Sequence, residues 1–293
     1  MDPQVIGSLA ALGSAASWAV GTILFKQLGA HIEPTAMTLA KGICSSMLLG
    51  FALIGVGCKD IDLITWGLLI ASGVLGISLG DTFFFAALRN LSAYVVVVFF
   101  MLGQVLTALL AVLLLGETVE IYEVIGIVIT IGGVSLVLLS QSWNEDLSSS
   151  NMVGIFYGIL SMLCMSGSVI LAKQALAETP SIQATFIRMF TGMLGVFIFS
   201  IITGQTSGFL KPFMNLKVSF HFLIAVIVVT FGGFWLSLVG VKYLDVAIAN
   251  TLNSTEPLFA LPLVVIFLKE RITFPMIIGS MISICGVIIL TGV

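Results

Sequence analysis

Charged side chains are scarce in this chain. Only 9% of its 293 residues are Asp, Glu, Lys or Arg, whereas an ordinary soluble domain carries roughly 25%. Hydrophobic residues make up 59%, and the net charge is −3. With so few cations there is no basic surface for nucleic acid. The composition therefore predicts a polytopic membrane protein whose surroundings are the lipid bilayer.

Residues that build metal and catalytic sites are also sparse. The four cysteines stand singly, without a CxxC pair, and no HExxH or GxxxxGK[ST] motif occurs. The sequence therefore predicts no disulfide, no metal site, no cofactor and no enzymatic activity. The N-terminal segment MDPQVIG lacks the positive region of a signal peptide, so we expect the first apolar run to be retained.

Long apolar runs dominate the remainder. A helix needs about 20 apolar residues to cross the hydrocarbon layer. Ten runs of about this length occur, at 5–26, 34–57, 64–88, 92–115, 120–140, 152–174, 181–204, 218–242, 246–268 and 273–292. The short connections leave no room for a soluble domain. We predict an all-α membrane protein with ten transmembrane helices.

The chain repeats itself at nearly constant spacing. Lys26 is matched by Lys173, 147 residues later, and Glu117 by Glu270, 153 residues later. Five helices per copy is an odd number, so the second copy must enter the membrane from the opposite side, as in many secondary transporters. We predict two inverted five-helix repeats and a polar linker between them, at residues 5–140, 152–292 and 141–151.

Four segments carry a family likeness. They are ISLGDTFFFAAL (77–88), LLLGETVE with the following IGIVITIGGV (113–120 and 125–134), STEPLFALPLVVIFLKERIT (254–273) and IGSMISICGVIIL (278–290). In these segments the chain resembles the drug/metabolite transporter superfamily, specifically its ten-helix branch built from two EamA domains. The resemblance implies a carrier of small metabolites, amino acids, nucleotide sugars or drugs. No substrate motif of the family transfers to a position here.

The resemblance also implies a location. An even number of spans puts both termini on one side, and the likeness favours the cytoplasmic side of the plasma membrane. The distribution of Lys and Arg argues the other way, because more of them fall on the side opposite the termini. We keep the cytoplasmic assignment as the prediction. The sequence is compatible with a monomer and leaves the oligomeric state open.

A glutamate and a proline lie side by side in the ninth run. A charge at this depth costs roughly 2.5–3.5 kcal/mol on insertion scales, so Glu256 should face protein or water. Pro257 cannot donate to the carbonyl of Asn253, which should bend or gate the helix. Asn250, Asn253 and Glu256 share one face, and we predict that this face lines the substrate cavity. A structural proline kink whose polar groups touch no substrate is the alternative.

Asp81 is the other acid inside an apolar run. Gly76 and Gly80 belong to a stripe of small residues suited to close helix packing, which leaves Asp81 for the cavity or a gate. A structural role, such as pairing with Arg89, is the alternative. Glu256, and less so Asp81, is a candidate for binding a proton during transport.

Three further residues are predicted to line the cavity. Trp18 lies in mid-span, where an aromatic ring can form a wall for an apolar or cationic ligand, although core packing explains it equally well. Gln104 and Trp235 are weaker candidates of the same kind. Gly103-Gln104 stands in the first half where Glu256-Pro257 stands in the second, so the site should be chemically asymmetric.

Two cations occur at matched positions, about seven residues into their runs. Inverted topology suggests that Lys41 and Arg188 lie near opposite faces of the membrane. Long cationic side chains near helix ends can extend to the interface. The alternative is that they hold an anionic substrate or lipid headgroups.

These features predict a secondary transporter that moves a small molecule by alternating access. The substrate is expected to be amino-acid-like or amphipathic, the direction efflux, and coupling to protons is one option. An exchanger of anionic or nucleotide-linked solutes is an alternative. Another is a channel-like or scaffold membrane protein that transports nothing.

Overall fold

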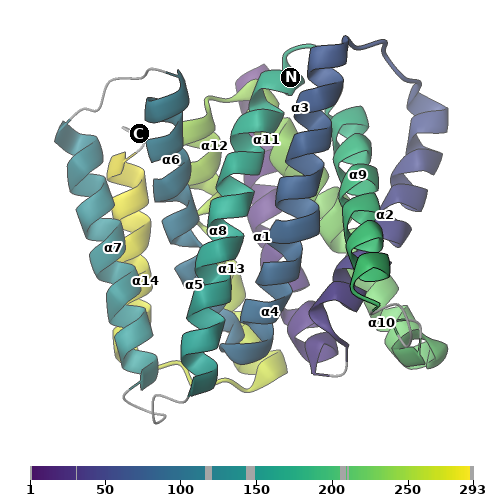
Figure 1. The fold of residues 1–293 in the computed structure, drawn as a ribbon. Coiled ribbons are helices and arrows are strands. Elements are labelled where there is room, and N and C mark those ends of the chain that lie inside the picture. Colours follow the sequence, from purple (N-terminus) through teal and green to yellow (C-terminus); the bar gives the residue numbers. More distant parts are fainter. Residues whose placement is uncertain are drawn as a thin grey trace.

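A computed structural model describes residues 2–30, 32–115, 121–142, 149–204, 209 and 211–290, and no strand occurs among them. The first half contains α1 (Pro3–Gly29), α2 (Pro34–Val56), α3 (Leu63–Gly73), η1 (Val74–Asp81), α4 (Thr82–Asn90), α5 (Ala93–Phe99), α6 (Met101–Leu115) and α7 (Ile121–Ser142). The second half contains α8 (Ser149–Leu176), α9 (Ser181–Ile202), η2 (Lys211–Met214), α10 (Leu216–Ile227), η3 (Val228–Trp235), α11 (Leu236–Tyr243), α12 (Val246–Asn253), α13 (Glu256–Leu263), η4 (Val264–Leu268) and α14 (Phe274–Leu290). Figure 1 shows one bundle, with both ends of the chain at the same end of it.

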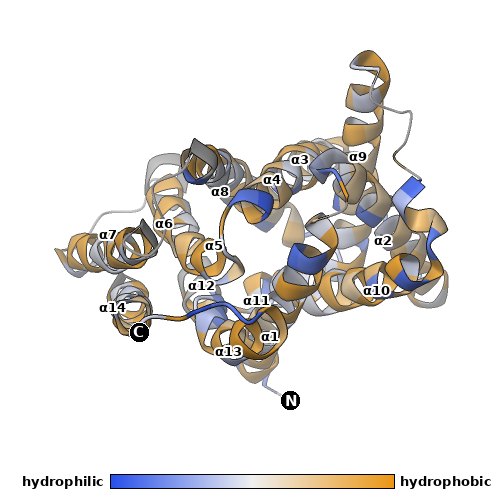
Figure 2. Cartoon of the chain, turned by 90° about the horizontal axis from the view of Figure 1, so that it is seen from below, coloured by the Kyte–Doolittle hydropathy of each residue, from blue (hydrophilic) through white to orange (hydrophobic). Residues whose placement is uncertain are grey.

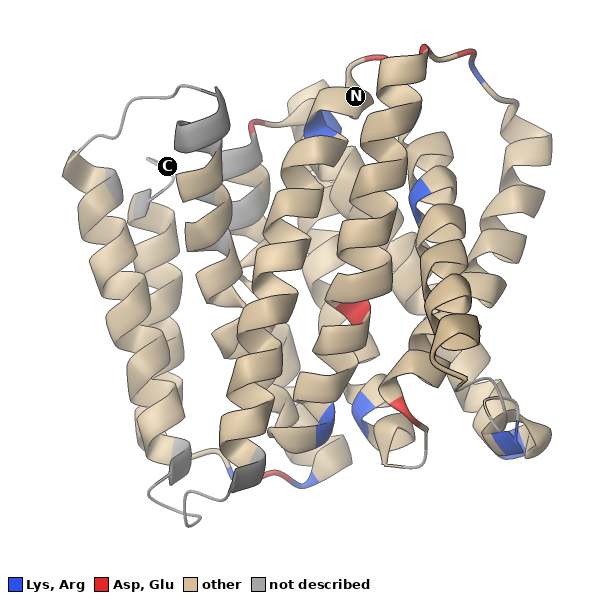
Figure 3. Ribbon diagram, in the orientation of Figure 1, with Lys and Arg blue, Asp and Glu red and all other residues tan. Residues whose placement is uncertain are grey.

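The bundle has the length and surface of an integral membrane protein. Six helices are long and apolar enough to cross a membrane: Pro3–Gly29, Pro34–Val56, Leu63–Asn90, Asn151–Leu176, Ser181–Ile202 and Leu216–Tyr243. Four shorter apolar helices accompany them: Ala93–Thr107, Val124–Ser140, Glu256–Leu268 and Phe274–Ile289. Hydrophobic residues cover most of the helices (Figure 2), and most charged residues lie at the two ends of the bundle (Figure 3). The chain is therefore an integral membrane protein.

The third helix of each half is long and has a π-helical middle. Segments α3, η1 and α4 run on as one helix, and so do α10, η3 and α11. Each begins with a side-chain cap. The carboxylate of Asp62 accepts from the N–H of Thr65 at 2.9 Å, and the amide oxygen of Asn215 accepts from the N–H of Lys217 at 3.0 Å. These caps satisfy backbone donors that the first turn leaves unpaired.

The first helix of each half packs against the third helix of the other. Ser14 on α1 donates to the carbonyl of Gly233 on η3 at 2.9 Å, and Ser161 on α8 donates to the carbonyl of Gly80 on η1 at 2.7 Å. The serines are 147 residues apart and the glycines 153, which are the two spacings read from the sequence. The same buried interaction therefore occurs once in each half.

Two matched lysines repeat this symmetry at the helix ends. Lys26 donates to two carbonyls at the end of α4, at 2.6 Å each. Lys173 donates to two carbonyls at the end of α11, at 2.8 and 3.1 Å. A cation at a helix C-terminus compensates the unpaired carbonyls and the negative end of the helix dipole.

Glycines bring the fifth helices of the two halves, α7 and α14, into close contact. A Cβ atom at Gly133 would lie 2.5 Å from the carbonyl oxygen of Gly279. A Cβ atom at Gly286 would lie 2.5 Å from the backbone nitrogen of Thr130. Only residues without a Cβ allow the two backbones to approach this closely.

The fourth helix of each half is interrupted. Phe100 separates α5 from α6, and Ser254 and Thr255 separate α12 from α13. The helix thus breaks directly before Glu256-Pro257, where the sequence predicts a bend. Pro257 is the second residue of α13, so its missing N–H costs no helical hydrogen bond. The break places Glu256 in the first turn of a new helix.

Candidate functional site

A cavity of about 180 Å³ lies between the two halves. Segments from both halves contribute to its wall, including the interrupted fourth helix of each. Most of the wall is apolar, formed by residues such as Phe84, Phe100 and Met165, and a few polar side chains interrupt it. A concave apolar site with a small number of polar groups is typical of small-molecule binding.

Glu256 lies on the cavity wall with the residues of the helix break. Asn253, Ser254 and Pro257 line the same region, and the hydroxyl of Thr22 lies within hydrogen-bonding reach of the carboxyl group of Glu256. The side-chain oxygen of Asn253 is buried and has no hydrogen-bond partner among the described residues. The break therefore presents a carboxylate and an amide oxygen to the cavity.

Trp18 lies on the cavity wall and is also packed. Its ring centroid is 4.7 Å from that of Phe234 and 6.3 Å from that of Phe84, both in edge arrangements. Aromatic rings prefer such offset or edge contacts. Trp18 thus has both of the roles that the sequence left open, because it lines the cavity and also packs against other aromatic side chains.

Three of the predicted wall residues are not found among the described residues of the cavity lining. The side chains of Gln104 and Asn250 lie outside the described part of the chain. Trp235 packs against Phe231, with 6.4 Å between ring centroids, and is absent from the described lining of the cavity.

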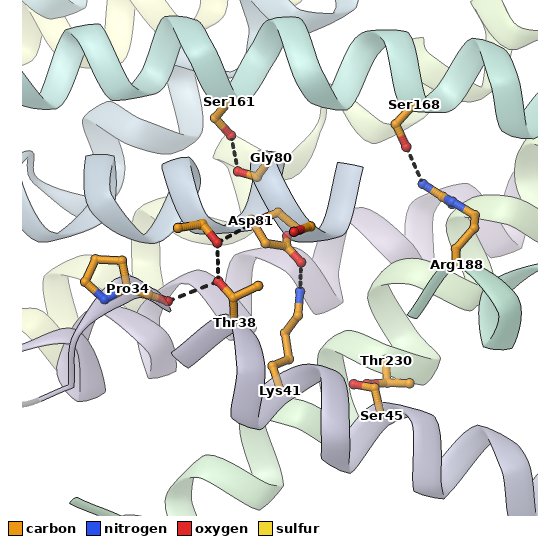
Figure 4. Close-up of polar contacts among 12 residues, drawn as sticks. Pro34, Thr38, Lys41, Ser45, Gly80, Asp81, Ser161, Ser168, Arg188 and Thr230 are labelled. Carbon is orange, nitrogen blue, oxygen red and sulfur yellow. Dashed lines mark hydrogen bonds and ion pairs between the residues drawn. The ribbon is translucent and has the colours of Figure 1, made fainter. Parts of the chain in front are cut away.

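Asp81 is a buried ion-pair partner and does not line the cavity. One of its carboxylate oxygens, Oδ2, accepts from the ammonium group of Lys41 on α2, and both side chains are 1% exposed (Figure 4). Arg89, the partner considered from sequence, instead pairs with Glu33 at 2.8 Å. The other oxygen of Asp81, Oδ1, has no partner among the described residues. The buried charges are tolerated because they neutralise each other.

Lys41 and Arg188 are neither near opposite faces nor extended to the interface, which corrects both expectations. Each is buried, and each interacts electrostatically with Asp81. Because both interact with the same carboxylate, they do not lie at opposite faces of a hydrocarbon layer about 30 Å thick. Helix α2 packs against α9, and the charges of the two cations interact with each other.

Arg188 reaches the cavity. Its side chain is 6% exposed and belongs to the cavity wall, and a terminal nitrogen donates to the hydroxyl of Ser168 at 2.9 Å (Figure 4). Its Nε has no partner among the described residues. Ser168 is held in turn by hydrogen bonds with Ser72. The guanidinium group is therefore fixed at one end and available at the other.

The sequence of both halves matches the model of a known protein family. The model of the EamA-like transporter family matches residues 5–139 and again residues 152–292. The chain belongs to the EamA-like transporter family. This EamA-like transporter is accordingly a membrane transporter and not an enzyme, and the likeness found in its sequence motifs is confirmed.

Two proteins that are similar to the EamA-like transporter differ from it widely in sequence. The UDP-N-acetylglucosamine transporter of Rattus norvegicus is 28% identical over 192 residues, which are 62% of this chain and 56% of the relative. The match thus spans little more than half of the relative's length. A solved crystal structure covers 98% of this chain and 96% of its own, with a TM-score of 0.69 and 16% identity. At that identity the likeness shows a shared fold alone.

The reading of the EamA-like transporter's sequence missed Thr22 and did not place Arg188 in the central cavity. Thr22 lies four residues after Trp18 on α1, so the two share a helix face, and this spacing could have found it. Arg188 was considered as a residue that extends to the membrane surface or, as the alternative, as a contact for an anionic substrate or lipid headgroups. In the repeat, Arg188 matches Lys41, and Phe234 matches Asp81. These two matches together would have shown that the second half has no acid in the position where Asp81 accompanies Lys41.

Proposed function

We propose that this EamA-like transporter is a secondary carrier for a small, amino-acid-like or amphipathic metabolite, and that it works by alternating access. The central cavity between the two halves, lined by interrupted helices, carries this proposal, because secondary carriers place their sites there. A volume of about 180 Å³ supports a small solute, since sites for drug-sized ligands usually measure roughly 300–1,000 Å³.

We further propose ten spans in two inverted repeats, residues 5–140 and 152–292. The four shorter apolar helices would then cross the membrane together with the six long ones. In Figure 1, α1 begins at the end of the bundle that carries the N-terminus and α8 begins at the opposite end, which supports the inversion. Of the proposed linker, residues 141–151, the central part at 143–148 lies outside the described residues.

One end of the bundle holds contacts suited to a closed gate. The carboxylate of Glu270, from the second half, accepts from the N–H groups of Ala93 and Tyr94 at 2.8 and 3.3 Å. Lys26 ties α1 to the end of α4 beside it and interacts with the charge of Glu270. Alternating access would require these contacts to open in the other state. Glu117, the counterpart of Glu270, lies outside the described residues.

Glu256 is the proposed substrate contact and proton-binding group. Asp81 ranks below it as a proton site because Lys41 already neutralises its charge. Uptake of labelled amino acids into liposomes containing the purified protein, with and without a pH gradient, tests this role. Glu256→Gln should slow uptake and remove the effect of the gradient, whereas Glu33→Gln, which changes an exposed carboxylate, should do neither. Equal rates and equal gradient dependence in Glu256→Gln would exclude the proton role.

Exchange of a nucleotide-linked solute is the second candidate, and the similarity to a UDP-N-acetylglucosamine transporter favours it. The described wall offers a single cation, Arg188, to a diphosphate and encloses a small volume, so we rank this function lower. Counterflow of labelled UDP-N-acetylglucosamine would reverse the ranking. Saturable counterflow of any solute distinguishes a carrier from a channel or scaffold.

Direction and sidedness rest on the family resemblance. We propose export across the plasma membrane with both termini in the cytoplasm. Uptake into inside-out vesicles, compared with uptake into right-side-out vesicles, tests the direction. A reporter fused to either terminus tests the sidedness.

A further inference from the structure

Arg188 is a buried cation that forms no ion pair with a carboxylate among the described residues. Of the described residues that line the cavity, Arg188 is the cation and Glu256 the anion, and they come from different helices, α9 and α13. The guanidinium group donates to the neutral hydroxyl of Ser168, and its Nε has no partner among the described residues. A charge held in a membrane interior without a counter-charge is costly. Such a group is expected where a ligand supplies the missing charge.

The reason why Arg188 is unpaired lies in the neighbouring ion pair. Asp81 is close enough to Arg188 for their charges to interact, but its Oδ2 is bonded to Lys41. The ammonium group of Lys41 also lies 4.4 Å from the centre of the Phe234 ring. Lys41 is therefore held by a carboxylate and by an aromatic face. The negative charge of Asp81 is thus neutralised by Lys41 and does not neutralise Arg188.

The charges that remain in the cavity are complementary to a zwitterion. A guanidinium group presents planar, paired donors that match a carboxylate. The carboxylate of Glu256 and the unpartnered side-chain oxygen of Asn253 are acceptors suited to an ammonium group. The ring of Trp18 on the same wall offers a further contact to a cation. A dianionic phosphate would instead face one cation together with a repelling carboxylate.

We propose that Arg188 binds the carboxylate of a small zwitterionic solute, that Glu256 binds its ammonium group, and that the Lys41–Asp81 pair is a positioning device that keeps Arg188 free. This inference rests on the proposed carrier function and assigns the solute class and the residues that select it. Lys41 and Asp81 act through Arg188 and do not touch the solute.

Ligand analogues test the charge requirement. The twenty common L-α-amino acids are screened singly by thermal shift of the full-length protein in detergent. The amino acid that gives the largest shift is then compared with its methyl ester, which lacks the carboxylate, and with its N-acetyl form, which lacks the ammonium group. Each analogue should bind at least roughly tenfold more weakly than the parent, because each loses a charge-assisted contact. An analogue that binds as tightly as the parent overturns the proposal.

Variants test the residues. Arg188→Gln should lose roughly tenfold or more in affinity, and Arg188→Lys, which keeps the charge but not the paired donors, should lose less. Arg89→Gln, at an exposed ion pair, is the matched control and should bind as wild type. If Arg188→Gln does not fold, the analogue comparison on the wild-type protein decides. Unchanged affinity in a folded Arg188→Gln overturns the proposal.

The positioning role of the Lys41–Asp81 pair is tested separately. Lys41→Met should weaken binding because Asp81 then pairs with Arg188, and the double variant Lys41→Met/Asp81→Asn should restore it. A purely structural role of the pair predicts no such rescue, and absence of rescue in a folded double variant overturns this part.

Failure of the inference can be separated from failure of the proposed function. If no amino acid binds but labelled UDP-N-acetylglucosamine shows saturable counterflow in liposomes, the zwitterion site is wrong and the carrier function stands. If no solute of either class shows counterflow, both are wrong.

Discussion

The two halves of the chain give equivalent cations different surroundings. Lys41 and Arg188 occupy matched positions on α2 and α9, yet within the described part of the chain Lys41 is bonded to a carboxylate and Arg188 to a neutral hydroxyl. The difference originates on the third helix, where the residue matching Asp81 in the second half is Phe234. At the helix contacts, by contrast, the halves use the same interactions twice. Duplication thus supplies a symmetric scaffold, and single residues make its cavity asymmetric.

The largest effect is expected from changing the buried ion pair between Lys41 and Asp81, which the described part of the second half lacks. Lys41→Met removes the ammonium group that is bonded to Asp81, and Arg188 can replace it only by giving up its hydrogen bond to Ser168, so the free energy of unfolding should fall by about 3–5 kcal/mol. Thermal denaturation in detergent measures this. The double variant Lys41→Met/Asp81→Asn should recover most of the loss. Arg188→Met, which strands no directly bonded carboxylate, should lose less than Lys41→Met, and an equal loss would contradict the assigned asymmetry.

The next effect tests the symmetric contact between α7 and α14. Gly133→Ala and Gly286→Ala each place a Cβ within 2.5 Å of a backbone atom of the other helix, and each should destabilise the protein by about 1–3 kcal/mol. A Cβ atom at Gly132 would meet no atom within 4 Å among the described residues. Gly132→Ala is therefore the matched control, and a loss as large as that of Gly133→Ala would refute the packing argument.

A smaller effect is expected from the matched lysines. Lys26→Met and Lys173→Met each remove two hydrogen bonds to helix-terminal carbonyls. Each should lower the free energy of unfolding by about 1–2 kcal/mol, because the carbonyls lose a charged donor. Melting temperatures of the two variants should fall by similar amounts. A large difference between them would show that the repeat is less symmetric in energy than in geometry.

The smallest effect concerns the caps of the third helices. Hydrogen bonds from the side chain and backbone of Thr65 lower the pKa of the exposed Asp62 carboxyl below its usual 3.8. The folded protein therefore binds this proton less readily than the unfolded chain, so the stabilisation is present above the unfolded pKa and is lost as the pH falls below 3.8 through the folded value. Asn215, the matching cap, does not titrate.

Exchanging the two capping residues, Asp62 and Asn215, tests this difference in acid sensitivity between the halves. Asp62→Asn should leave the melting temperature at neutral pH nearly unchanged and reduce its decrease below pH 3.8. Asn215→Asp should add acid sensitivity in the second half. Identical acid profiles for Asp62→Asn and wild type would show that the titration of Asp62 contributes nothing to the acid sensitivity.

Much of the fold was predictable because its signals are local. Apolar runs located the helices, the spacing of residues such as Lys26 and Lys173 revealed the repeat, and the pair Glu256-Pro257 marked the break between α12 and α13. The wall positions of Trp18, Asn253 and Glu256 agree with the residues chosen from sequence. Wheel positions and spacing along one helix suffice for such inferences.

The partners of the buried charges were not predictable in the same way. Asp81 was compared with Arg89, its neighbour in sequence, whereas its partner Lys41 lies on another helix, 40 residues away. Arg188 was placed near a membrane surface because its distance from the start of its helix was considered, and not the point where α9 packs against α2. Contacts of this kind depend on how helices cross, which no periodicity within one helix encodes.

The sequence by itself determined that this chain is a duplicated helical membrane transporter, because hydropathy and repetition are properties of the order of residues. Only the tertiary structure decided which charges neutralise each other and which remain at the cavity. In an interior of low dielectric, the cost of a charge depends on the few ångströms between it and its partner, and those distances exist only after the helices have packed.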